Sequence, residues 1–585
     1  MPSIAPTINK GLGMNRANFS TLVEGIDYAA RGQTGFSFYS ARGELTTTLS
    51  YTELRDRARS LAVTLGAFEL ERYSRVAVVA ETIPEFSIFF FACQYAGLLP
   101  VPLPMHINLG GKESYVHRLR GLMEASGISA AVSSPDVIDL LKEACEGLAV
   151  RFVGTHDDLV NFPGREDLQP LASDEPAYIQ YSSGSTRRPK GVLISQRAIT
   201  SNANAILCNG IELRRGDRCI SWLPLYHDMG LVGFCLTPLL GQMTIDYLAT
   251  SDFAKRPLVW LRLLSENQCT IAFSPSFGYE LCQRRASDGA ISSLDLSSWR
   301  IAGIGGDMIR DEVLDRFTEK FSLCGFKRST FLPSYGLAES TLAVTFASVE
   351  DEFDTDTIDR THFSISGKAR PLHAVDHPDR ARRFVICGKP MPKHEVQILD
   401  NKGSILGDRK VGRVVIRGPS LMDGFFNDER LTQEVLSDDG WLDTGDLGYT
   451  INGSLVVTGR SKDLIIINGR NIWPEDIEWA VQELPGIRRG DVAAFAIDQD
   501  NAEGIVAVVQ CRTRDSGQRK ELERQVQSTV RLLAGADCEV VLVPPGSILI
   551  TSSGKIGRAA TREKYLAGEY ASAAYESASA KMAVG

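Results

Sequence analysis

The stretch YSSGSTRRPKGV, residues 181–192, joins an apolar strand-like run, AYIQY (177–181), to a helical pattern, SQRAITSNANAI (195–206). A glycine-rich loop between a strand and a helix is typical of α/β folds, and its N–H groups commonly bind phosphate. Its spacing is not that of the P-loop G-x-x-x-x-G-K-[ST], because the second glycine follows the lysine. The loop alone is equally compatible with a surface turn. The side chains and backbone that could surround an anion are Ser182, Ser183, Gly184, Ser185, Thr186 and Lys190.

The same alternation of strand and helix extends on both sides of this loop. Short β-rich runs are separated by helical patterns such as YTELRDRARSLAVTLGAF (51–68). Strands that alternate with helices form parallel sheets covered by helices. We therefore predict an α/β fold, with two helix-covered, mainly parallel sheet subdomains in a large N-terminal domain. The strand candidates are RVAVVAE (75–81), ISAAVSS (128–134), AVRFVGT (149–155), CISWLPL (219–225), CTIAFSP (269–275) and WRIAGIGG (299–306).

The pattern changes after residue 347. Residues 348–383 are polar and weakly periodic, which predicts an insertion or a long loop. Residues 384–461 contain short strands and turns, which indicate a small β-barrel-like subdomain that completes a large domain over 1–461. Residues 462–585 predict a small, mobile α+β domain. Its Ala/Ser-rich tail, 568–585, is expected to be disordered.

Composition limits the functional classes. The 585 residues carry a net charge of −9, which gives no basic footprint for a nucleic acid. The 11 cysteines include no C-x-x-C pair, which favours reduced thiols in a cytoplasmic protein. The most apolar run, FSIFFFACQYAGLLPVPL (86–103), is broken by Gly97 and Pro100. We expect a buried helix and strand there rather than a stable membrane insertion.

Four further stretches resemble, in the expected order, motifs of one superfamily. They are YGLAES (335–340), GWLDTGDLG (440–448), VTGRSKDLIIINGRNIWPEDIE (457–478) and TSSGKIGR (551–558). Together with YSSGSTRRPKGV they are similar to the motifs of adenylate-forming enzymes, which include acyl-CoA synthetases, luciferases and nonribosomal-peptide adenylation domains. The resemblance extends over nearly the whole chain. Each motif alone could be a turn or a solvated carboxylate, but five in order are specific.

The resemblance implies a reaction between a carboxylate and ATP, in which pyrophosphate is released and Mg²⁺ neutralises phosphate charge. It implies that Lys555 bridges the carboxylate and the nucleotide, that Glu339 and Thr186 hold Mg²⁺, and that Asp446 and Arg460 contact the ribose. Lys555 lies in the small domain, so the site is complete only when the domains close. The family's hinge corresponds to Lys462. The other implied nucleotide contacts are Ser182, Ser183, Gly184, Ser185, Lys190, Asp228, Gly305, Gly306, Asp307, Ser334, Tyr335, Gly336, Leu337 and Ala338.

Other stretches resemble one branch, the fatty acyl-AMP ligases. They are WLPLYHDMGLVG (222–233), SPSFGYELCQRR (274–285) and PLPM (102–105). In this branch the acyl-adenylate passes to the phosphopantetheine thiol of an acyl carrier protein, or of a polyketide or nonribosomal peptide synthase carrier domain. An extra segment, here 348–383, works against the CoA-dependent step; the alternative is a variable surface loop. The resemblance implies that His227 takes part in catalysis near the adenylate. It also implies an acyl tunnel walled by Ser276, Phe277, Gly278 and Tyr279, although the two aromatic residues could equally be plain core.

One motif departs from the family pattern, and two other functions stay open. Where relatives often have N-G-A-E-P near the adenine, this chain has IGGDM (304–308). The alternatives are a fatty acyl-CoA synthetase that releases acyl-CoA and a non-catalytic ATP-binding scaffold. An acidic carrier protein would need a local basic patch for docking. Basic residues of the small domain are candidates for this patch, although an ordinary solvated charged face explains them at least as well. These candidates are Arg488, Arg489, Arg519, Lys520 and Arg524.

Overall fold

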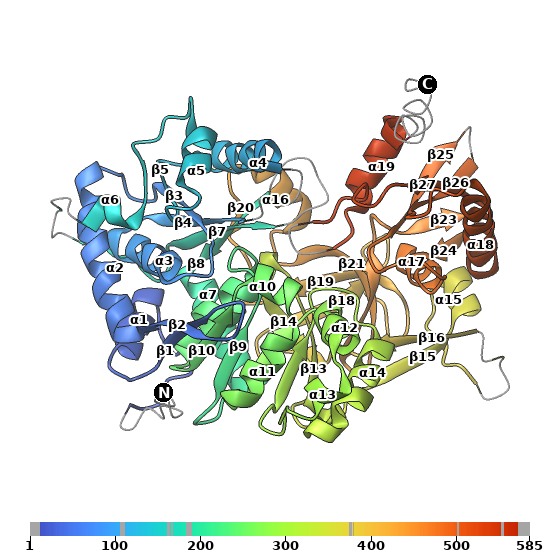
Figure 1. Cartoon of the computed structure of the whole chain (residues 1–585), viewed down its shortest axis with the longest axis horizontal. Coiled ribbons are helices and arrows are strands. Elements are labelled where there is room, and N and C mark those ends of the chain that lie inside the picture. Colours follow the sequence, from blue (N-terminus) through green and yellow to red (C-terminus); the bar gives the residue numbers. More distant parts are fainter. Residues whose placement is uncertain are drawn as a thin grey trace.

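The computed structural model describes residues 12–105, 111–160, 164, 168–182, 190–373, 377, 380–467, 469–499, 502–551 and 555–570. Within these residues, the largest sheet has nine strands in the order β17-β14-β13-β12-β11-β9-β10-β1-β2 (Figure 1). The strands from β1 through β10, β9, β11 and β12 to β13 pair in parallel, and the edge pairs are antiparallel. Their bounds are β1 Gly35–Tyr39, β2 Leu45–Ser50, β9 Arg218–Ser221, β10 Thr244–Leu248, β11 Ile271–Ser274, β12 Ile301–Ile304, β13 Phe331–Gly336, β14 Ala343–Phe346 and β17 Lys389–Pro390.

A second sheet is entirely parallel, in the order β4-β3-β5-β6. Its strands are β3 Arg75–Val79, β4 Leu99–Leu103, β5 Ala130–Val132 and β6 Phe152–Gly154. The two sheets, one mainly parallel and one entirely parallel, confirm the predicted α/β class. The helices that accompany them include α2 Tyr51–Leu65, α3 Pro84–Ala96, α4 Gly111–Ser126, α7 Gln196–Ala205, α11 Leu258–Glu266, α12 Ser276–Arg285 and α14 Asp311–Phe321.

The apolar run around residue 90 is the buried helix α3 followed by the buried strand β4, as predicted. Proline at the first turn starts α3, and Gly97 ends it with a φ of +72° that favours glycine. Among the described residues, no helix is both long enough and apolar enough to span a bilayer.

The glycine-rich loop joins two antiparallel strands rather than a strand and a helix. Strands β7 Pro176–Ser182 and β8 Lys190–Ser195 form a three-stranded sheet with β20 Gly424–Phe425. Helix α7 begins directly after β8, where the Ser195 hydroxyl accepts a hydrogen bond from the N–H of Ala198. The loop therefore starts and ends at the pair Ser182 and Lys190.

The β-rich subdomain is an antiparallel four-stranded sheet in the order β18-β19-β21-β22. Its strands are β18 Glu395–Leu399, β19 Gly412–Arg417, β21 Leu442–Ile451 and β22 Ser454–Arg460. Strands β21 and β22 pair Asp446 with Arg460 across the ladder, which brings two predicted site residues together.

The polar segment 348–383, which the sequence predicts as an insertion or a long loop, has regular secondary structure over part of its length. It contains strand β15 Thr355–Asp359 and helix α15 Arg360–Ser366, and β15 pairs with β16 Ala381–Val385. The ring of Phe363 stacks on Trp473 of the C-terminal unit with centroids 4.5 Å apart. Ile358, Phe363 and Ala369 are buried in a small cluster with Phe384 and Trp473, which anchors a segment that otherwise has little apolar periodicity.

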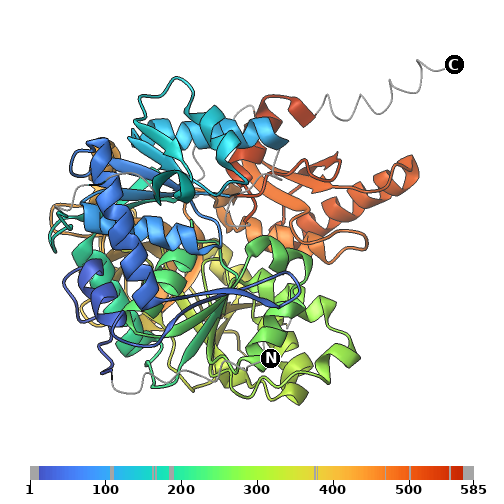
Figure 2. The same ribbon diagram turned by 60° about the vertical axis from the view of Figure 1, so that its left-hand side comes forward.

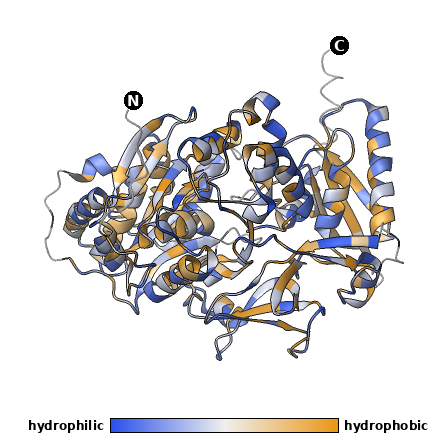
Figure 3. Cartoon of the chain, turned by 90° about the horizontal axis from the view of Figure 1, so that it is seen from below, coloured by the Kyte–Doolittle hydropathy of each residue, from blue (hydrophilic) through white to orange (hydrophobic). Residues whose placement is uncertain are grey.

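The C-terminal unit has its own hydrophobic core, built from residues 465 onward. Figure 2 shows it, in orange and red, on one side of the larger part, and Figure 3 shows long hydrophobic stretches in its strands. The predicted tail is partly ordered, since Tyr570 is buried in this core; residues 571–585 lie outside the described residues. The unit contains β23 Ile465–Ile467, β24 Arg470–Ile472, α17 Pro474–Gln482, β25 Val492–Gln499, β26 Ala502–Gln510, α18 Ser516–Ala534, β27 Cys538–Val543 and α19 Arg558–Leu566.

Candidate active site

A cavity of about 1230 Å³ lies where the large unit and the C-terminal unit meet. Both units contribute to its walls, so site residues predicted in the two units meet in one cavity. Predicted site residues in the lining are Lys190, His227, Asp228, Phe277, Gly305, Gly306, Asp307, Ser334, Tyr335, Gly336, Leu337, Ala338, Glu339, Asp446, Arg460, Lys462 and Lys555. Ser182 ends β7, and Ser183, Gly184, Ser185 and Thr186 lie outside the described residues.

Lys555 enters the cavity from the C-terminal unit. Its N–H donates to the Thr551 hydroxyl at 3.1 Å, which fixes the turn that carries it. Burial and the nearby guanidinium of Arg460 lower the pKa of Lys555, while Asp307 and Asp228 oppose this. A half-buried ammonium among carboxylates is suited to bind a substrate anion.

Arg558, three residues later, fixes this segment to the rest of its unit. It forms a two-point pair with Glu478 at 2.7 and 2.8 Å and also contacts Glu475 at 2.7 Å and Asp463 at 2.8 Å. Burial alone would lower the pKa of Arg558, but these carboxylates hold it well above its usual value. The pairs tie the start of α19 to α17 and to the connection between the two units, next to the predicted hinge, Lys462.

Tyr335 and Arg460 hold the two carboxylate oxygens of Asp446. The Tyr335 hydroxyl donates to Oδ2 at 2.7 Å, and Nε of Arg460 lies 3.3 Å from Oδ1. Burial and the Asp446 charge raise the pKa of Tyr335, so its hydroxyl stays protonated as a donor. Asp446 is thus a fixed acceptor at the cavity wall, where a pair of hydroxyl groups could bind.

His227 and Asp228 form a close pair before helix α8, Asp228–Leu231. The Nδ1 atom of His227 lies 2.7 Å from Oδ1 of Asp228, and the N–H of Met229 donates to the same oxygen at 2.6 Å. Burial would raise the pKa of Asp228, but His227 and the Met229 N–H lower it. Asp228 is therefore held as a carboxylate in the cavity.

Glu339 is a half-buried carboxylate in the cavity lining. Burial raises its pKa and Asp228 adds to this, whereas Arg460 and Lys190 oppose it. A buried carboxylate of this kind is stabilised by a cation. No group of three metal-ligating side chains occurs in the part of the chain that the structure describes. Mg²⁺ usually takes most of its ligands from phosphate and water, so a single protein carboxylate such as Glu339 is compatible with this ion.

The glycines of the IGGDM motif bring backbone close to the cavity. A Cβ on Gly305 would lie 2.8 Å from the carbonyl oxygen of Ser334, and Gly306 has a φ of +79°. Both positions therefore require glycine. Asp307 follows them, and its Oδ1 is 3.2 Å from the Ser276 hydroxyl.

Of the four residues predicted to wall an acyl tunnel, Phe277 alone lines the cavity. Tyr279 is a core residue: it is fully buried, donates to the Gly303 carbonyl oxygen at 2.8 Å and packs on aromatic rings. Ser276 is buried beside Asp307. A Cβ on Gly278 would lie 2.1 Å from the Ser274 hydroxyl oxygen, so this glycine serves close packing. Of the two alternatives left open for Tyr279, the structure shows the core residue, and Ser276 and Gly278 do not line the cavity.

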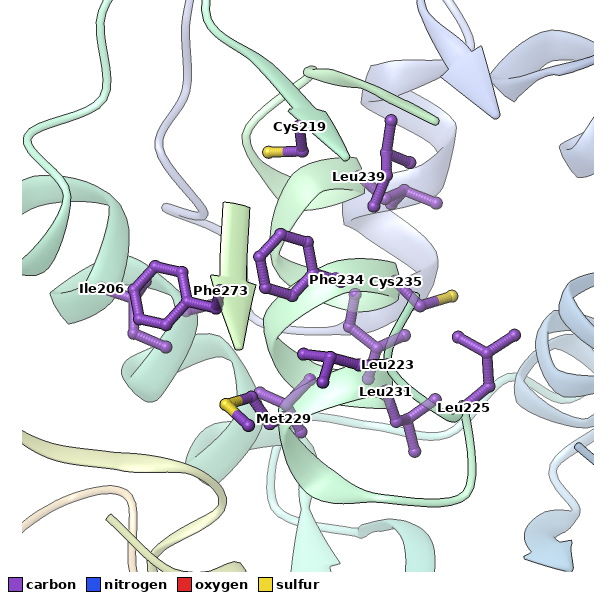
Figure 4. Packing of buried hydrophobic residues seen from close by; sticks show 14 of the residues in the cluster. Ile206, Cys219, Leu223, Leu225, Met229, Leu231, Phe234, Cys235, Leu239 and Phe273 are labelled. Carbon is purple, nitrogen blue, oxygen red and sulfur yellow. The ribbon is translucent and has the colours of Figure 1, made fainter. Parts of the chain in front are cut away.

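An apolar side of the cavity was missed by the sequence analysis. Its lining includes Leu223, Met229, Phe273, Leu342, Ala343 and Phe346. The rings of Phe273 and Phe346 are 6.4 Å apart at 87° and each residue is 9% exposed, so they close this side. Figure 4 shows Phe273 beside Phe234. The centroids of these two rings are 5.8 Å apart. A Cβ on Gly303 would lie 2.0 Å from the Phe273 ring, which shows that this strand leaves room for the ring.

Comparison with known proteins agrees with this geometry. The model of the family described as "AMP-binding enzyme" matches residues 28–426. The chain belongs to this family. This AMP-binding enzyme is 44% identical to a putative acyl-CoA synthetase of Caulobacter vibrioides over 95% of its length and 96% of the relative's. It is 30% identical to medium-chain-fatty-acid–[acyl-carrier-protein] ligase JamA of Moorena producens, over 95% of its own length and 96% of that protein's.

A solved structure from a study of fatty acyl-adenylate ligases of E. coli and L. pneumophila superposes with a TM-score of 0.91. The match is 43% identical and covers 96% of this AMP-binding enzyme and 100% of that chain. The resemblance to fatty acyl-AMP ligases, and with it the fold and the class of enzyme, is confirmed. These relatives do not support the alternative function, a non-catalytic ATP-binding scaffold.

Proposed function

We propose that this enzyme activates a fatty acid as acyl-adenylate with ATP, and then transfers the acyl group to the phosphopantetheine thiol of an acyl carrier protein. The observation that carries this is the cavity in which Lys555 from the C-terminal unit faces the charged residues of the large unit. Its apolar side, next to Met229 and Phe273, suits an acyl chain. The acyl chain would therefore lie against the rings of Phe273 and Phe346, with its carboxylate toward Lys555.

In the first step a carboxylate oxygen attacks the α-phosphorus of ATP. The bond from this phosphorus to the bridging oxygen of pyrophosphate breaks, and no proton is transferred. Lys555 lies where it can hold the two anions together, and Asp446 with Tyr335 orients the ribose hydroxyls. Positioning and charge compensation are what such a displacement requires. Glu339 would hold Mg²⁺, which neutralises charge on the phosphates when bound.

In the second step the thiol sulfur attacks the acyl carbonyl carbon, AMP leaves with the bonding electrons and the thiol proton is released. The carrier protein as acceptor is supported by the likeness to the carrier-protein ligase of Moorena producens. The segment 348–383 would restrain the C-terminal unit against the CoA-dependent step, through the stacked pair Phe363 and Trp473. Carriers of lipid, polyketide or lipopeptide assembly fit this proposal. All eleven cysteines are free thiols, which supports a cytoplasmic setting.

The name of the Caulobacter vibrioides relative favours a second candidate, an acyl-CoA synthetase. One experiment separates the two. The purified enzyme is incubated with ATP, Mg²⁺ and fatty acids from butyrate to palmitate, with and without CoA, and the products are identified by mass spectrometry. We expect acyl-AMP to accumulate even with CoA present. Acyl-CoA as the main product would favour the synthetase, and the absence of both products would contradict fatty-acid activation.

A further inference from the structure

Arg489 of the C-terminal unit contacts two carboxylates of the large unit. Its Nη1 donates to Oε2 of Glu280 at 2.5 Å, and its Nη2 lies 3.6 Å from Oδ2 of Asp307. The guanidinium carbon is 5.9 Å from the centre of the Phe277 ring. The side chains of Arg489, Glu280 and Asp307 are 29%, 20% and 17% exposed, so water screens these pairs less than surface pairs.

Both carboxylates lie on elements that wall the cavity. Glu280 is on α12, and Asp307 follows β12 in the IGGDM motif. Burial raises the pKa of Asp307, and Arg489 and then Lys555 lower it. The positive charges that stabilise the Asp307 carboxylate therefore both come from the C-terminal unit. Movement of that unit away from the cavity would remove them together.

Two other ion pairs between the two units have the opposite arrangement. They are Arg310 with Glu483 at 3.7 Å and Arg382 with Asp476 at 2.9 Å. In both, the cation belongs to the large unit and the acid to the C-terminal unit. Arg489 differs because it reaches into the large unit and ends on carboxylates that line the cavity.

We propose that Arg489, Glu280 and Asp307 form a latch that holds the C-terminal unit closed during adenylate formation and opens before acyl transfer. Arg489 is a positioning residue, since it acts through the placement of Lys555 rather than on the reacting atoms. The proposal rests on the proposed function. It also replaces the hypothesis that Arg489 belongs to a basic patch for an acidic carrier protein. The Arg489 side chain is half-buried between the units and so does not present a free docking charge.

The test measures the two half-reactions separately. Arg489→Gln, Glu280→Gln and the double variant are compared with wild type. The control, Arg514→Gln, removes the same charge from an exposed residue of the same unit that has no ion pair among the described residues. Adenylation is followed as acyl-AMP formed from ATP and the preferred fatty acid. Transfer is followed from synthetic acyl-AMP to pantetheine, and the radius of gyration is measured by small-angle X-ray scattering.

We expect Arg489→Gln to slow adenylation about fivefold or more, within the usual range for coupling between two states. Transfer should be unchanged or faster, and the radius of gyration should increase. The double variant should be no slower in adenylation than the slower single variant, because both substitutions break the same contact between Arg489 and Glu280.

The latch is overturned if both half-reactions slow equally, if Arg489→Gln matches Arg514→Gln, or if the effects of the two substitutions multiply. A wild-type enzyme that forms no acyl-AMP would contradict the proposed function instead. Small-angle X-ray scattering still tests the latch in that case, since an equal radius of gyration for wild type and Arg489→Gln would rule the latch out.

Discussion

The Tyr335 hydroxyl donates a 2.7 Å hydrogen bond to Asp446, which joins the end of β13 in the nine-stranded sheet to β21 of the β-rich subdomain. Tyr335→Phe should raise the KM for ATP about tenfold, since a hydrogen bond to a charged group contributes roughly 1.5–3 kcal/mol. The KM for the fatty acid should change little. Steady-state pyrophosphate release measures both values.

Tyr51→Phe is the matched control for that experiment. The Tyr51 hydroxyl is also buried but donates to the Met243 carbonyl oxygen at 2.7 Å, and the residue does not line the cavity. It should lower the Tm without changing the KM for ATP. Equal KM values in wild type and Tyr335→Phe would show that Asp446 does not need this hydrogen bond.

Lys555→Ala should reduce acyl-AMP formation at least about a hundredfold, because a positioned charge in the transition state is removed. ATP binding, measured by calorimetry, should survive, since Asp446, Tyr335 and Arg460 remain. Lys564→Ala, on α19 but outside the cavity lining, should keep normal activity. Equal rates for Lys555→Ala and wild type would remove Lys555 from catalysis.

The pH dependence of adenylation should reveal the environment of Lys555. Burial and Arg460 lower the pKa of Lys555, so its positive charge is lost at a lower pH than the ordinary value of 10.5. The rate should therefore be level at neutral pH and fall on the alkaline side, below pH 10.5. Lys555→Arg should remove this alkaline decline, even if it is slower overall, because guanidinium stays charged. If wild type and Lys555→Arg show the same alkaline fall in adenylation rate, another titrating group causes it.

Phe273→Ala should shift substrate preference toward longer acyl chains. The Phe273 ring closes the apolar side of the cavity together with Phe346, and its removal opens space toward Gly303 and Phe234. Competition among fatty acids, followed by mass spectrometry of acyl-AMP, measures the shift. Phe253→Ala is the control, because this core ring stacks on Trp222 and lies outside the lining. An unchanged profile for Phe273→Ala would place the acyl chain elsewhere.

Phe363→Ala should increase acyl-CoA formation several-fold if segment 348–383 restrains the C-terminal unit. The substitution removes the ring that stacks on Trp473, and an aromatic pair contributes about 0.5–1.5 kcal/mol beyond its buried area. Product ratios with CoA present provide the measurement. Phe353→Ala, in the same segment but packed on Phe331 of the large unit, is the matched control. No change in the ratio would make the stacking structural only.

The motifs predicted most of the charged site but little of its apolar wall. Glu339, Asp446, Arg460 and Lys555 belong to short runs whose residue types and order are specific, and all of them line the cavity. Phe273 lies inside CTIAFSP, a run that correctly predicts strand β11. A continuous apolar run does not say which side chain faces a cavity.

Residue types also failed to predict two contacts between distant segments. The motif leaves Tyr279 open between an acyl tunnel and the core, and only the packing of helix α12 on Trp299 and Phe331 shows that it is core. Arg489 looks like surface charge because its neighbours are polar, and only the packing of two units shows its partners. Such contacts depend on tertiary arrangement, which local patterns do not encode.

The cavity walls come from two units, and this has a consequence for the lifetime of the intermediate. An acyl-adenylate made inside is protected from hydrolysis only while the C-terminal unit covers it. The opening that admits a thiol also admits water, at a far higher concentration. The fraction of each turnover that is wasted is therefore set by how long the enzyme stays open before a carrier arrives.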